Sequence, residues 1–251
     1  MKILATSDAH IPKGEAELQK AVEASCGQGE EVDVLILAGD MIERGKIALY
    51  PRVKEILSKC KARITIGIFG NEEFDDLRDE IEKNNEWVLW LNDDVKDISI
   101  NGEKILVFGS TGILDEPTIW QRKNIPSIEE RYNARLRKLE EFLKIKFNGT
   151  KIAVFHYPPT YKTLYGEPSF AWHEMGSRRA EELIKKLGGV DLVIHGHAHR
   201  GKVLSVKIGE AEVYNVSLPA RKDLFKYEFK KGKISLMDFL DEKNIAERKR
   251  S

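Results

Sequence analysis

Apolar and polar residues follow two patterns along the first half of the chain. Short runs rich in Ile, Val and Leu end at Gly or polar residues, which is typical of buried strands. These runs cover residues 2–6, 33–38 and 64–69. The stretches between them have the periodicity of amphipathic helices and cover residues 15–25, 48–59 and 73–84. Strands that alternate with helices in this way predict a parallel sheet covered by helices.

The second half of the chain is richer in strands. Three apolar runs lie close together at residues 87–91, 95–100 and 104–109, and Asn101-Gly102 between the last two is typical of a hairpin. The remaining predicted elements are a helix at 127–146, a strand at 151–155, a helix at 176–187, and strands at 191–195, 202–208, 212–217, 224–230 and 233–239. We therefore expect an α/β fold of two mixed sheets packed together, with helices on both outer faces. Residues 1–240 would form this single domain, and residues 241–251 a charged C-terminal tail.

Composition fits one compact enzyme domain. The 251 residues are 41% hydrophobic, and the formal net charge of zero gives no sign of a nucleic-acid or membrane-surface binder. A charged fraction of 33%, rich in Lys and Glu, leans towards a thermophilic source. Cys26 and Cys60 are too few for a disulfide scaffold, so a reducing compartment is expected. The N-terminus has no signal-peptide apolar region, and no apolar run approaches the roughly 20 residues of a membrane span, which together predict a cytoplasmic protein.

Potential metal ligands follow five of the apolar runs. The blocks are Asp8-Ala9-His10, Gly39-Asp40, Gly70-Asn71, His156 and Gly196-His197-Ala198-His199. Five of the six His residues lie in or directly beside these blocks. Because open α/β sheets build their sites at the carboxyl ends of strands, we expect these side chains to lie together.

As coordination chemistry, the seven ligands divide into two metal positions. Asp8, His10 and His199 can hold one ion, and Asn71, His156 and His197 can hold the other. Asp40 can bridge them, since one carboxylate can give an oxygen to each ion. Mixed imidazole, carboxylate and amide ligands suit two divalent ions, Mn²⁺ above all, with Fe, Zn²⁺ or Ni²⁺ as alternatives. A hydroxide that bridges two such ions can attack a phosphoryl group in line.

In their order along the chain, the motifs DxH, GD, GN, H and GHxH resemble those of the calcineurin-like metallophosphoesterases. The resemblance runs from residue 8 to residue 199. Each motif alone is weak, but five in order, each after a predicted strand, are specific. The resemblance implies a four-layer αββα sandwich and metal-dependent hydrolysis of phosphoesters. The GHAH block is more similar to the branch of cyclic-nucleotide phosphodiesterases and small bacterial and archaeal phosphoesterases than to the protein phosphatases.

The residue after Asn71 departs from that pattern. Family members usually have a His there, which is thought to protonate the leaving oxygen, whereas this chain has Glu72. A glutamate is ordinarily ionised at neutral pH, so Glu72 would need a special environment to join Asp40 and Asn71 as a catalytic residue. We favour the alternative, in which Glu72 is an outer carboxylate or a salt-bridge partner. His173 and His195 are other possible proton donors, and a His at the end of a strand is more often structural.

Three further side chains are candidate substrate contacts. The block from Gly39 to Gly45 is similar to the GDxxDRG block of protein phosphatases, in which the Arg contacts phosphate, so Arg44 is one candidate. The alternative is a surface pair of Glu43 and Arg44 that orders the loop.

Trp120 and Tyr157 are the other two candidates. They lie in two long loops, residues 110–126 and 157–176, that we expect to shape the substrate pocket. The second loop also carries Tyr161, Tyr165, Phe170 and Trp172. Aromatic residues there can stack on a planar substrate group. They can also pack the loop onto the body or form a dimer contact, so a homo-oligomer is possible.

The leading prediction is metal-dependent hydrolysis of a small-molecule phosphoester. Diesters are favoured over monoesters, because Glu72 and Glu73 would repel a dianion more than a monoanion. The alternatives are a phosphomonoesterase or a protein phosphatase that uses the same site. An alternative from another class is a metal-binding interaction scaffold, against which the complete set of seven ligands argues. A nuclease would need a basic patch for the phosphate backbone, so nucleic acid is not an expected partner.

Overall fold

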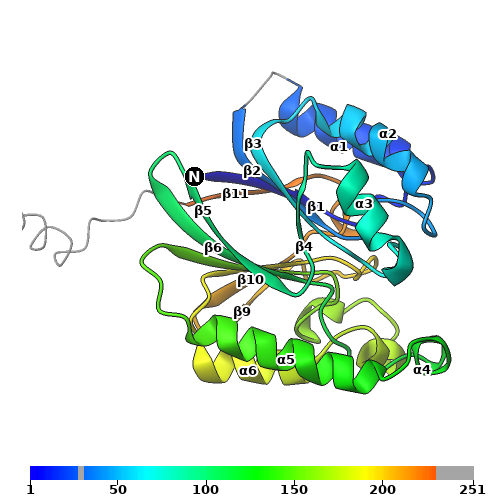
Figure 1. Cartoon of the computed structure of the whole chain (residues 1–251), viewed down its shortest axis with the longest axis vertical. Coiled ribbons are helices and arrows are strands. Elements are labelled where there is room, and N and C mark those ends of the chain that lie inside the picture. Colours follow the sequence, from blue (N-terminus) through cyan, green and yellow to red (C-terminus); the bar gives the residue numbers. More distant parts are fainter. Residues whose placement is uncertain (28–30, 230–251) are drawn as a thin grey trace, which may run out of the picture.

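The computed structural model describes residues 1–27 and 31–229, which form two sheets with helices on their outer faces (Figure 1). The strands are β1 (Lys2–Thr6), β2 (Glu31–Ala38), β3 (Lys61–Ile68), β4 (Leu89–Leu91), β5 (Asp94–Ile100), β6 (Glu103–Ser110), β7 (Thr150–Phe155), β8 (Leu192–His195), β9 (Ser205–Ile208), β10 (Ala211–Asn215) and β11 (Phe225–Glu228). The helices are α1 (Glu15–Cys26), α2 (Tyr50–Leu57), α3 (Arg78–Asn84), α4 (Ile119–Asn124), α5 (Ile128–Lys144), α6 (Arg178–Leu187) and α7 (Leu218–Arg221). Short 3₁₀ turns are η1 (Ile47–Leu49), η2 (Asp75–Leu77), η3 (Lys162–Leu164) and η4 (Ser169–Glu174).

Both sheets are mixed. The first has the order β11-β1-β2-β3-β4, in which β1 to β4 are parallel and β11 is antiparallel. The second has the order β5-β6-β7-β8-β10-β9, with a parallel centre and antiparallel strands at both edges. In Figure 1, α1 and α2 cover the first sheet, and α5 and α6 cover the second. The predicted sandwich is therefore confirmed.

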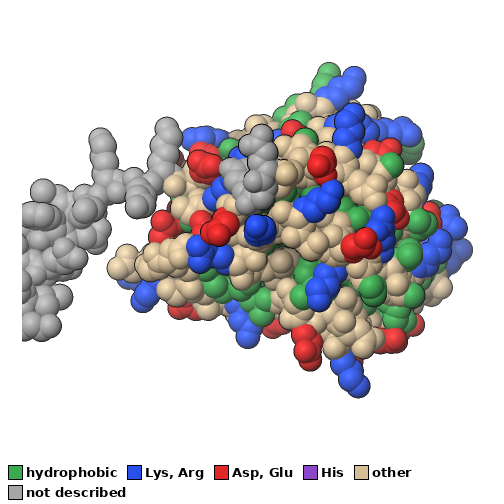
Figure 2. Space-filling model, turned by 90° about the horizontal axis from the view of Figure 1, so that it is seen from above, with side chains coloured by type: hydrophobic (Ala, Val, Ile, Leu, Met, Phe, Trp, Pro, Cys, Tyr) green, Lys and Arg blue, Asp and Glu red, His purple; other side chains and the backbone are tan. Residues whose placement is uncertain are grey.

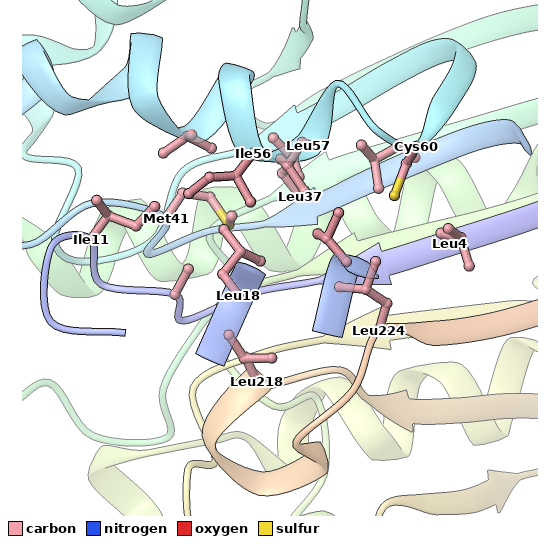
Figure 3. Packing of buried hydrophobic residues seen from close by; sticks show 14 of the residues in the cluster. Leu4, Ile11, Leu18, Leu37, Met41, Ile56, Leu57, Cys60, Leu218 and Leu224 are labelled. Carbon is pink, nitrogen blue, oxygen red and sulfur yellow. The ribbon is translucent and has the colours of Figure 1, made fainter. Parts of the chain in front are cut away.

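Three buried clusters hold these layers together. Because successive side chains of a strand point to opposite faces, Ile3 of β1 packs between the sheets while Leu4 packs under α1 and α2. Figure 3 shows part of this outer cluster, where Leu18 and Ile56 join Leu4. A third cluster fills the space between the second sheet and α5 and α6. The strands are apolar on both faces because both faces are covered.

The predicted elements differ from the observed ones mainly in the loops. The loop at 110–126 contains the unpredicted helix α4, which begins with a capping box. Thr118 Oγ1 accepts a hydrogen bond from the Gln121 backbone N–H at 3.2 Å, and Gln121 Oε1 accepts one from the Thr118 N–H at 3.0 Å. The helix α7 was also missed. The predicted strand at 233–239 and the tail at 241–251 lie outside the described residues, so the single domain at 1–240 stays a prediction.

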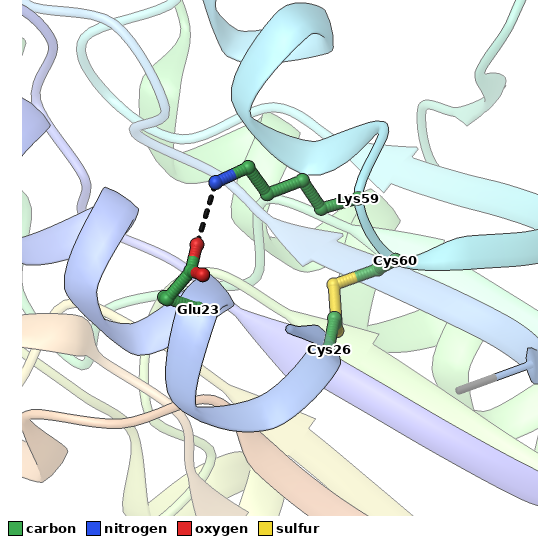
Figure 4. The surroundings of a disulfide bond; sticks show 4 residues. All are labelled: Glu23, Cys26, Lys59 and Cys60. Atoms are coloured by element: carbon green, nitrogen blue, oxygen red, sulfur yellow. Dashed lines mark hydrogen bonds and ion pairs between the residues drawn. A yellow bond between two sulfur atoms is a disulfide. The ribbon is translucent and has the colours of Figure 1, made fainter. Parts of the chain in front are cut away.

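Cys26 and Cys60 form a disulfide bond between the end of α1 and the start of β3 (Figure 4). An ion pair beside it, between Lys59 Nζ and Glu23 Oε2 at 2.5 Å, links the same two segments. The sequence analysis did not predict this bond, and the reducing compartment and cytoplasmic location that it expected stay predictions. The sequence did not reveal the pair because 34 residues separate the cysteines, and only packing brings their Cα atoms to 5.0 Å.

The surface over α1 and α2 carries charges of both signs. Figure 2 shows Lys and Arg side chains interspersed with Asp and Glu on this face, without a patch of one sign. Such a face is not suited to the phosphate backbone of nucleic acid, which needs clustered cations. In the part of the chain that the structure describes, no helix has the length and apolar character to cross a membrane.

Candidate metal centre and substrate cleft

The predicted ligands all lie at the carboxyl ends of strands. Asp8 and His10 follow β1, Asp40 follows β2, Asn71 follows β3, His156 follows β7, and His197 and His199 follow β8. The first three of these strands belong to one sheet and the last two to the other. The candidate centre is therefore built where the same edges of the two sheets meet.

Two groups of donor atoms converge at this edge. Asp8, His10 and His199 form one group, whose ligand atoms lie within 4.8 Å of one another. In it, His199 Nε2 lies 3.0 Å from Asp8 Oδ1 and 3.4 Å from His10 Nε2. Asp8, Asp40 and His156 form the second group by the same measure. Each group therefore offers three donor residues that could bind one metal ion.

Asp40 lies between the two groups. Its Oδ2 is 3.4 Å from His156 Nε2 and 4.0 Å from His10 Nε2. Asn71 adds an amide oxygen, since its Oδ1 lies 3.0 Å from His156 Nε2. The His197 ring is next to this group, with its centroid 5.0 Å from that of His156. Asp40 thus lies between the donors of the two predicted metal positions, and its bridging role stays a prediction.

Several candidate ligands have a strained backbone. Asp8, His10, Asp40 and His197 have φ values of 58°, 45°, 54° and 67°, in the left-handed region that costs such residues about 1–3 kcal/mol each. Backbone hydrogen bonds hold two of these turns: Asp8 N–H donates to Gly39 O at 3.0 Å and His10 N–H to Asp40 O at 3.0 Å. The hydrogen bonds thus keep these residues in strained conformations in which their side chains converge on a common centre.

The glycines of the GD and GN motifs allow the loops after β2 and β3 to touch. A Cβ on Gly70 would lie 2.0 Å from Asp40 Oδ1 and 2.6 Å from the Asp40 backbone N. Gly39 has a φ of 85°, and a Cβ there would lie 2.6 Å from the Gly70 backbone N. Larger residues at either position would push Asp40 and Asn71 apart.

Glu73, which the sequence analysis considered only as a charge near the site, has a buried linking role that was not predicted. Its side chain is buried, and Oε2 accepts hydrogen bonds from the N–H groups of Asp40 and Gly70, each at 2.8 Å. Oε1 accepts from the Met41 N–H at 2.9 Å and from the Tyr50 hydroxyl at 3.0 Å. Burial and the charge of Asp40 raise the pKa of Glu73 to about 7, although the N–H donors oppose the shift. This carboxyl group joins the two loops that carry Asp40 and Asn71.

Glu72, the neighbouring residue, faces the opposite way. Its carboxylate accepts a hydrogen bond from the Arg44 backbone N–H at 2.6 Å, and its own N–H donates to Asp40 Oδ1 at 2.8 Å. These contacts tie Glu72 to the Asp40 loop and support a structural role. No local pattern along the chain indicates which of the two glutamates is buried.

The charges at the centre suit bound cations. Burial alone would raise the pKa of Asp8, but the hydrogen bond from His199 and the charge of His156 hold it well below its ordinary value. Burial would lower the pKa of His156, but Asp40 and Asp8 raise it to about 9. Protonated His156 thus balances two buried carboxylates, and a divalent cation would supply that charge while His156 loses its proton. The donor set of imidazole, carboxylate and amide oxygen fits the ions that were predicted.

A cleft of about 960 Å³ opens from this centre. Asn71 and His197 form part of its wall, so it reaches the candidate ligands. All three predicted substrate contacts, Arg44, Trp120 and Tyr157, line it as well. This volume is in the range of small-molecule sites.

Most of the second long loop lies away from the cleft. Of its aromatic residues only Tyr157 lines the wall. Tyr161 packs against Trp172 with ring centroids 6.0 Å apart, and Arg178 of α6 lies over the Tyr161 ring at 4.6 Å. The loop therefore shapes the cleft only through Tyr157 and Glu174, while Tyr161 and Trp172 pack against each other and Arg178 of α6.

Arg44, His195 and His173 are the remaining residues that the sequence analysis singled out. The Arg44 side chain is exposed and makes no ion pair among residues 1–27 and 31–229, while Glu43 pairs with Lys46 at 3.1 Å. Lys46 lowers the pKa of Glu43 most and the charge of Arg44 lowers it further, so the alternative of a surface pair between Glu43 and Arg44 stays open. Burial lowers the pKa of His195 to about 4, so this side chain is neutral at ordinary pH. His173 is not among the residues that line the cleft.

The chain belongs to the calcineurin-like phosphoesterase family, whose model matches residues 1–201. It is accordingly a metal-dependent phosphoesterase, and the family implies a dinuclear site for divalent ions. A search of curated proteins found no match.

Solved structures share the fold at low sequence identity. Phosphopantetheinyl hydrolase from Mycobacterium tuberculosis is 14% identical with a TM-score of 0.64, covering 92% of this chain and 96% of that one. The 5'-nucleotidase precursor from Thermus thermophilus is 16% identical with a TM-score of 0.52, covering 92% of this chain and 51% of that one. GAP50, the anchor in the inner membrane complex of Plasmodium, is 13% identical with a TM-score of 0.53, covering 91% and 76%. The present chain thus spans about half of the nucleotidase precursor. At these identities the similarity shows the fold alone.

Proposed function

We propose that this enzyme hydrolyses small-molecule phosphodiesters in preference to phosphomonoesters. The observation that carries the proposal is the carboxylate of Glu72 on the cleft wall beside Asn71, with Glu73 directly behind it. A monoester dianion would be repelled by these groups more than a diester monoanion, by an amount that depends on the local dielectric.

The seven candidate ligands would hold two divalent ions, for which we favour Mn²⁺ over Fe, Zn²⁺ or Ni²⁺. Asp8, His10 and His199 serve one position, Asn71, His156 and His197 serve the other, and Asp40 serves both. Two divalent ions held there would supply the Lewis acidity that activates water for attack on a phosphoester. The contacts of Asp40 with groups on both sides support this assignment.

The protein's own side chains have three tasks. The Glu73 carboxyl group accepts from the Asp40 backbone N–H, and the Glu72 N–H donates to the Asp40 carboxylate, so both hold the Asp40 loop in place. The guanidinium of Arg44, which has no ion pair among the described residues, can bind a phosphate oxygen. Trp120 and Tyr157 form the wall against which an ester group can lie. Glu72 donates no proton in this proposal, so aryl esters, whose leaving groups depart unprotonated, should react faster than alkyl esters.

Two alternatives remain distinct from this proposal. Arg44 favours a monoesterase or a protein phosphatase, because an arginine that is not engaged elsewhere can clamp a terminal phosphate. A scaffold is the alternative from another class, and the structure described as an anchor shares the fold. Converging donor groups weigh against a scaffold, which gains nothing from them.

The test is the ratio of kcat/KM for bis(4-nitrophenyl) phosphate to that for 4-nitrophenyl phosphate, at one pH and with one metal. We expect a ratio above one. A ratio well below one would overturn the diester preference. Arg44→Ala should then lower monoester hydrolysis more than diester hydrolysis, which would assign the terminal phosphate to Arg44.

A further inference from the structure

The cleft has a second end, beyond the candidate ligands, where the short helix α4 forms part of the wall. Gln121 fixes this helix from below and is only 8% exposed. Its Nε2 donates to the Tyr157 hydroxyl at 3.1 Å, and its Oε1 accepts from the Tyr132 hydroxyl at 3.0 Å. Together with the capping box at Thr118, these bonds give a six-residue helix a defined position.

Trp120 is held on this fixed helix yet remains open to solvent. It lines the cleft with 61% of its surface exposed, and Phe74, at 39%, lines it from the segment after the GN motif. Leu114, Ile125 and Pro126 extend the same apolar wall. A large aromatic side chain on a rigid support loses little entropy on binding, which is the usual property of a contact that recognises a ligand.

The charges at this end are largely neutralised. Four arginines line the cleft, and three of them are in ion pairs: Arg78 and Arg131 share the carboxylate of Asp75, and Arg135 pairs with Asp93. Arg44 is the one lining arginine without an ion pair within the described ranges, and it lies beside the Glu72 loop. Asp76 and Glu174 add negative charge to the wall. Every arginine described at this end is already in an ion pair, so a substrate arm with several anionic groups would lack a free arginine partner here.

We propose that this end of the cleft selects phosphodiesters in which one ester arm is uncharged and carries a flat aromatic group that contacts Trp120. The inference rests on the proposed function, since it assigns the arm of a diester whose phosphate lies at the metal centre. Arms that carry further phosphates are selected against. Trp120 is thus a specificity-determining residue, and Gln121 is the residue that positions it.

The test uses diesters that share 4-nitrophenol as leaving group and differ only in the other arm. The arms are methyl, 2-naphthylmethyl and 3-phosphonopropyl. We expect kcat/KM for the naphthylmethyl ester to exceed that for the methyl ester by about tenfold or more, as burial of an aromatic group predicts. The phosphonopropyl ester should be the poorest. Equal values for the methyl and naphthylmethyl esters would overturn the inference while leaving diester hydrolysis intact.

Trp120→Ala should bring the ratio of naphthylmethyl to methyl ester close to one. The matched control is Phe170→Ala, which removes an aromatic ring that is 81% exposed but does not line the cleft, and the ratio should stay as in the wild type. A wild-type ratio in Trp120→Ala would show that the arm lies elsewhere.

Binding of 2-naphthylmethyl methylphosphonate, which has no ester bond to a good leaving group, gives a second measurement that does not depend on turnover. Calorimetry of the metal-loaded protein should show a Kd about tenfold weaker in Trp120→Ala than in the wild type. If none of the diesters reacts, the proposed function fails, but this comparison still decides the role of Trp120. Equal Kd values would refute it.

Discussion

The two ends of the cleft are built on different principles. At the metal end, five strands from both sheets supply the ligands, and hydrogen bonds between strained turns hold them. At the far end, helices and connecting segments supply partly exposed aromatic side chains on a wall whose charges are mostly paired. The contrast suggests a division of labour in which strand ends set the chemistry and the segments between them choose the substrate. Substitutions at the two ends should then have separable effects.

The largest effect is expected at Asp40. Asp40→Asn replaces the shared anionic ligand with a neutral one and should lower kcat/KM by at least about 100-fold. Mutation of a residue that only hydrogen-bonds to a metal ligand already lowers metal affinity or activity by about 10–100-fold. The variant should also lose at least one metal per chain, measured by elemental analysis. Asp97→Asn, at an exposed carboxylate on β5, is the control and should change neither. Two retained metals and near-normal turnover in Asp40→Asn would disprove the bridging role.

Glu73→Gln should have the next largest effect. The amide group of Gln would turn its NH₂ towards N–H or O–H donors that the carboxyl oxygens now satisfy, so a buried bond is lost at about 1–3 kcal/mol. We expect kcat to fall by about 10–100-fold and the urea midpoint of unfolding to fall with it. A loss of stability with unchanged kcat and metal content would assign Glu73 to the fold alone.

Glu72→Gln provides a matched comparison one residue away. Because the Glu72 carboxylate accepts a hydrogen bond from the Arg44 backbone N–H and an aryl leaving group departs without a proton, rates for aryl diesters should change little. The informative result is the rate for alkyl esters, whose leaving groups need a proton. A fall of about 10²–10⁴-fold for alkyl esters alone would show that Glu72 is a general acid and would reverse its proposed role.

The disulfide should affect stability without affecting chemistry. Cys26→Ser combined with Cys60→Ser opens a loop of 34 residues, and should lower the free energy of unfolding by about 3–4 kcal/mol. Because the bond lies at the end of α1 and neither cysteine lines the cleft, kcat and metal content should remain those of the wild type. If this variant instead had a changed ratio of kcat/KM for diesters to monoesters, the disulfide would influence the cleft, contrary to this prediction.

The metal end was largely predictable from the sequence, and the far end was not. Asp8, Asp40 and Asn71 each follow an apolar run within a few residues, so local order along the chain carries the signal. Glu73 reaches Asp40 across 33 residues, and nothing local marks it as buried. The helix α4 did have a capping signal at Thr118 and Gln121, but its place on the cleft depends on contacts with Tyr132 and Tyr157. Local sequence patterns could not predict these features, because they depend on contacts between residues that are far apart in the chain.

The most direct test of the central claim is a metal titration of the stripped protein. Mn²⁺ would be added in steps while bound metal per chain and hydrolysis of bis(4-nitrophenyl) phosphate are followed together. We predict no turnover in the stripped protein and saturation at about two ions per chain, as a bridged pair requires. Turnover that persists without metal, or full activity at one ion per chain, would contradict the two-ion centre.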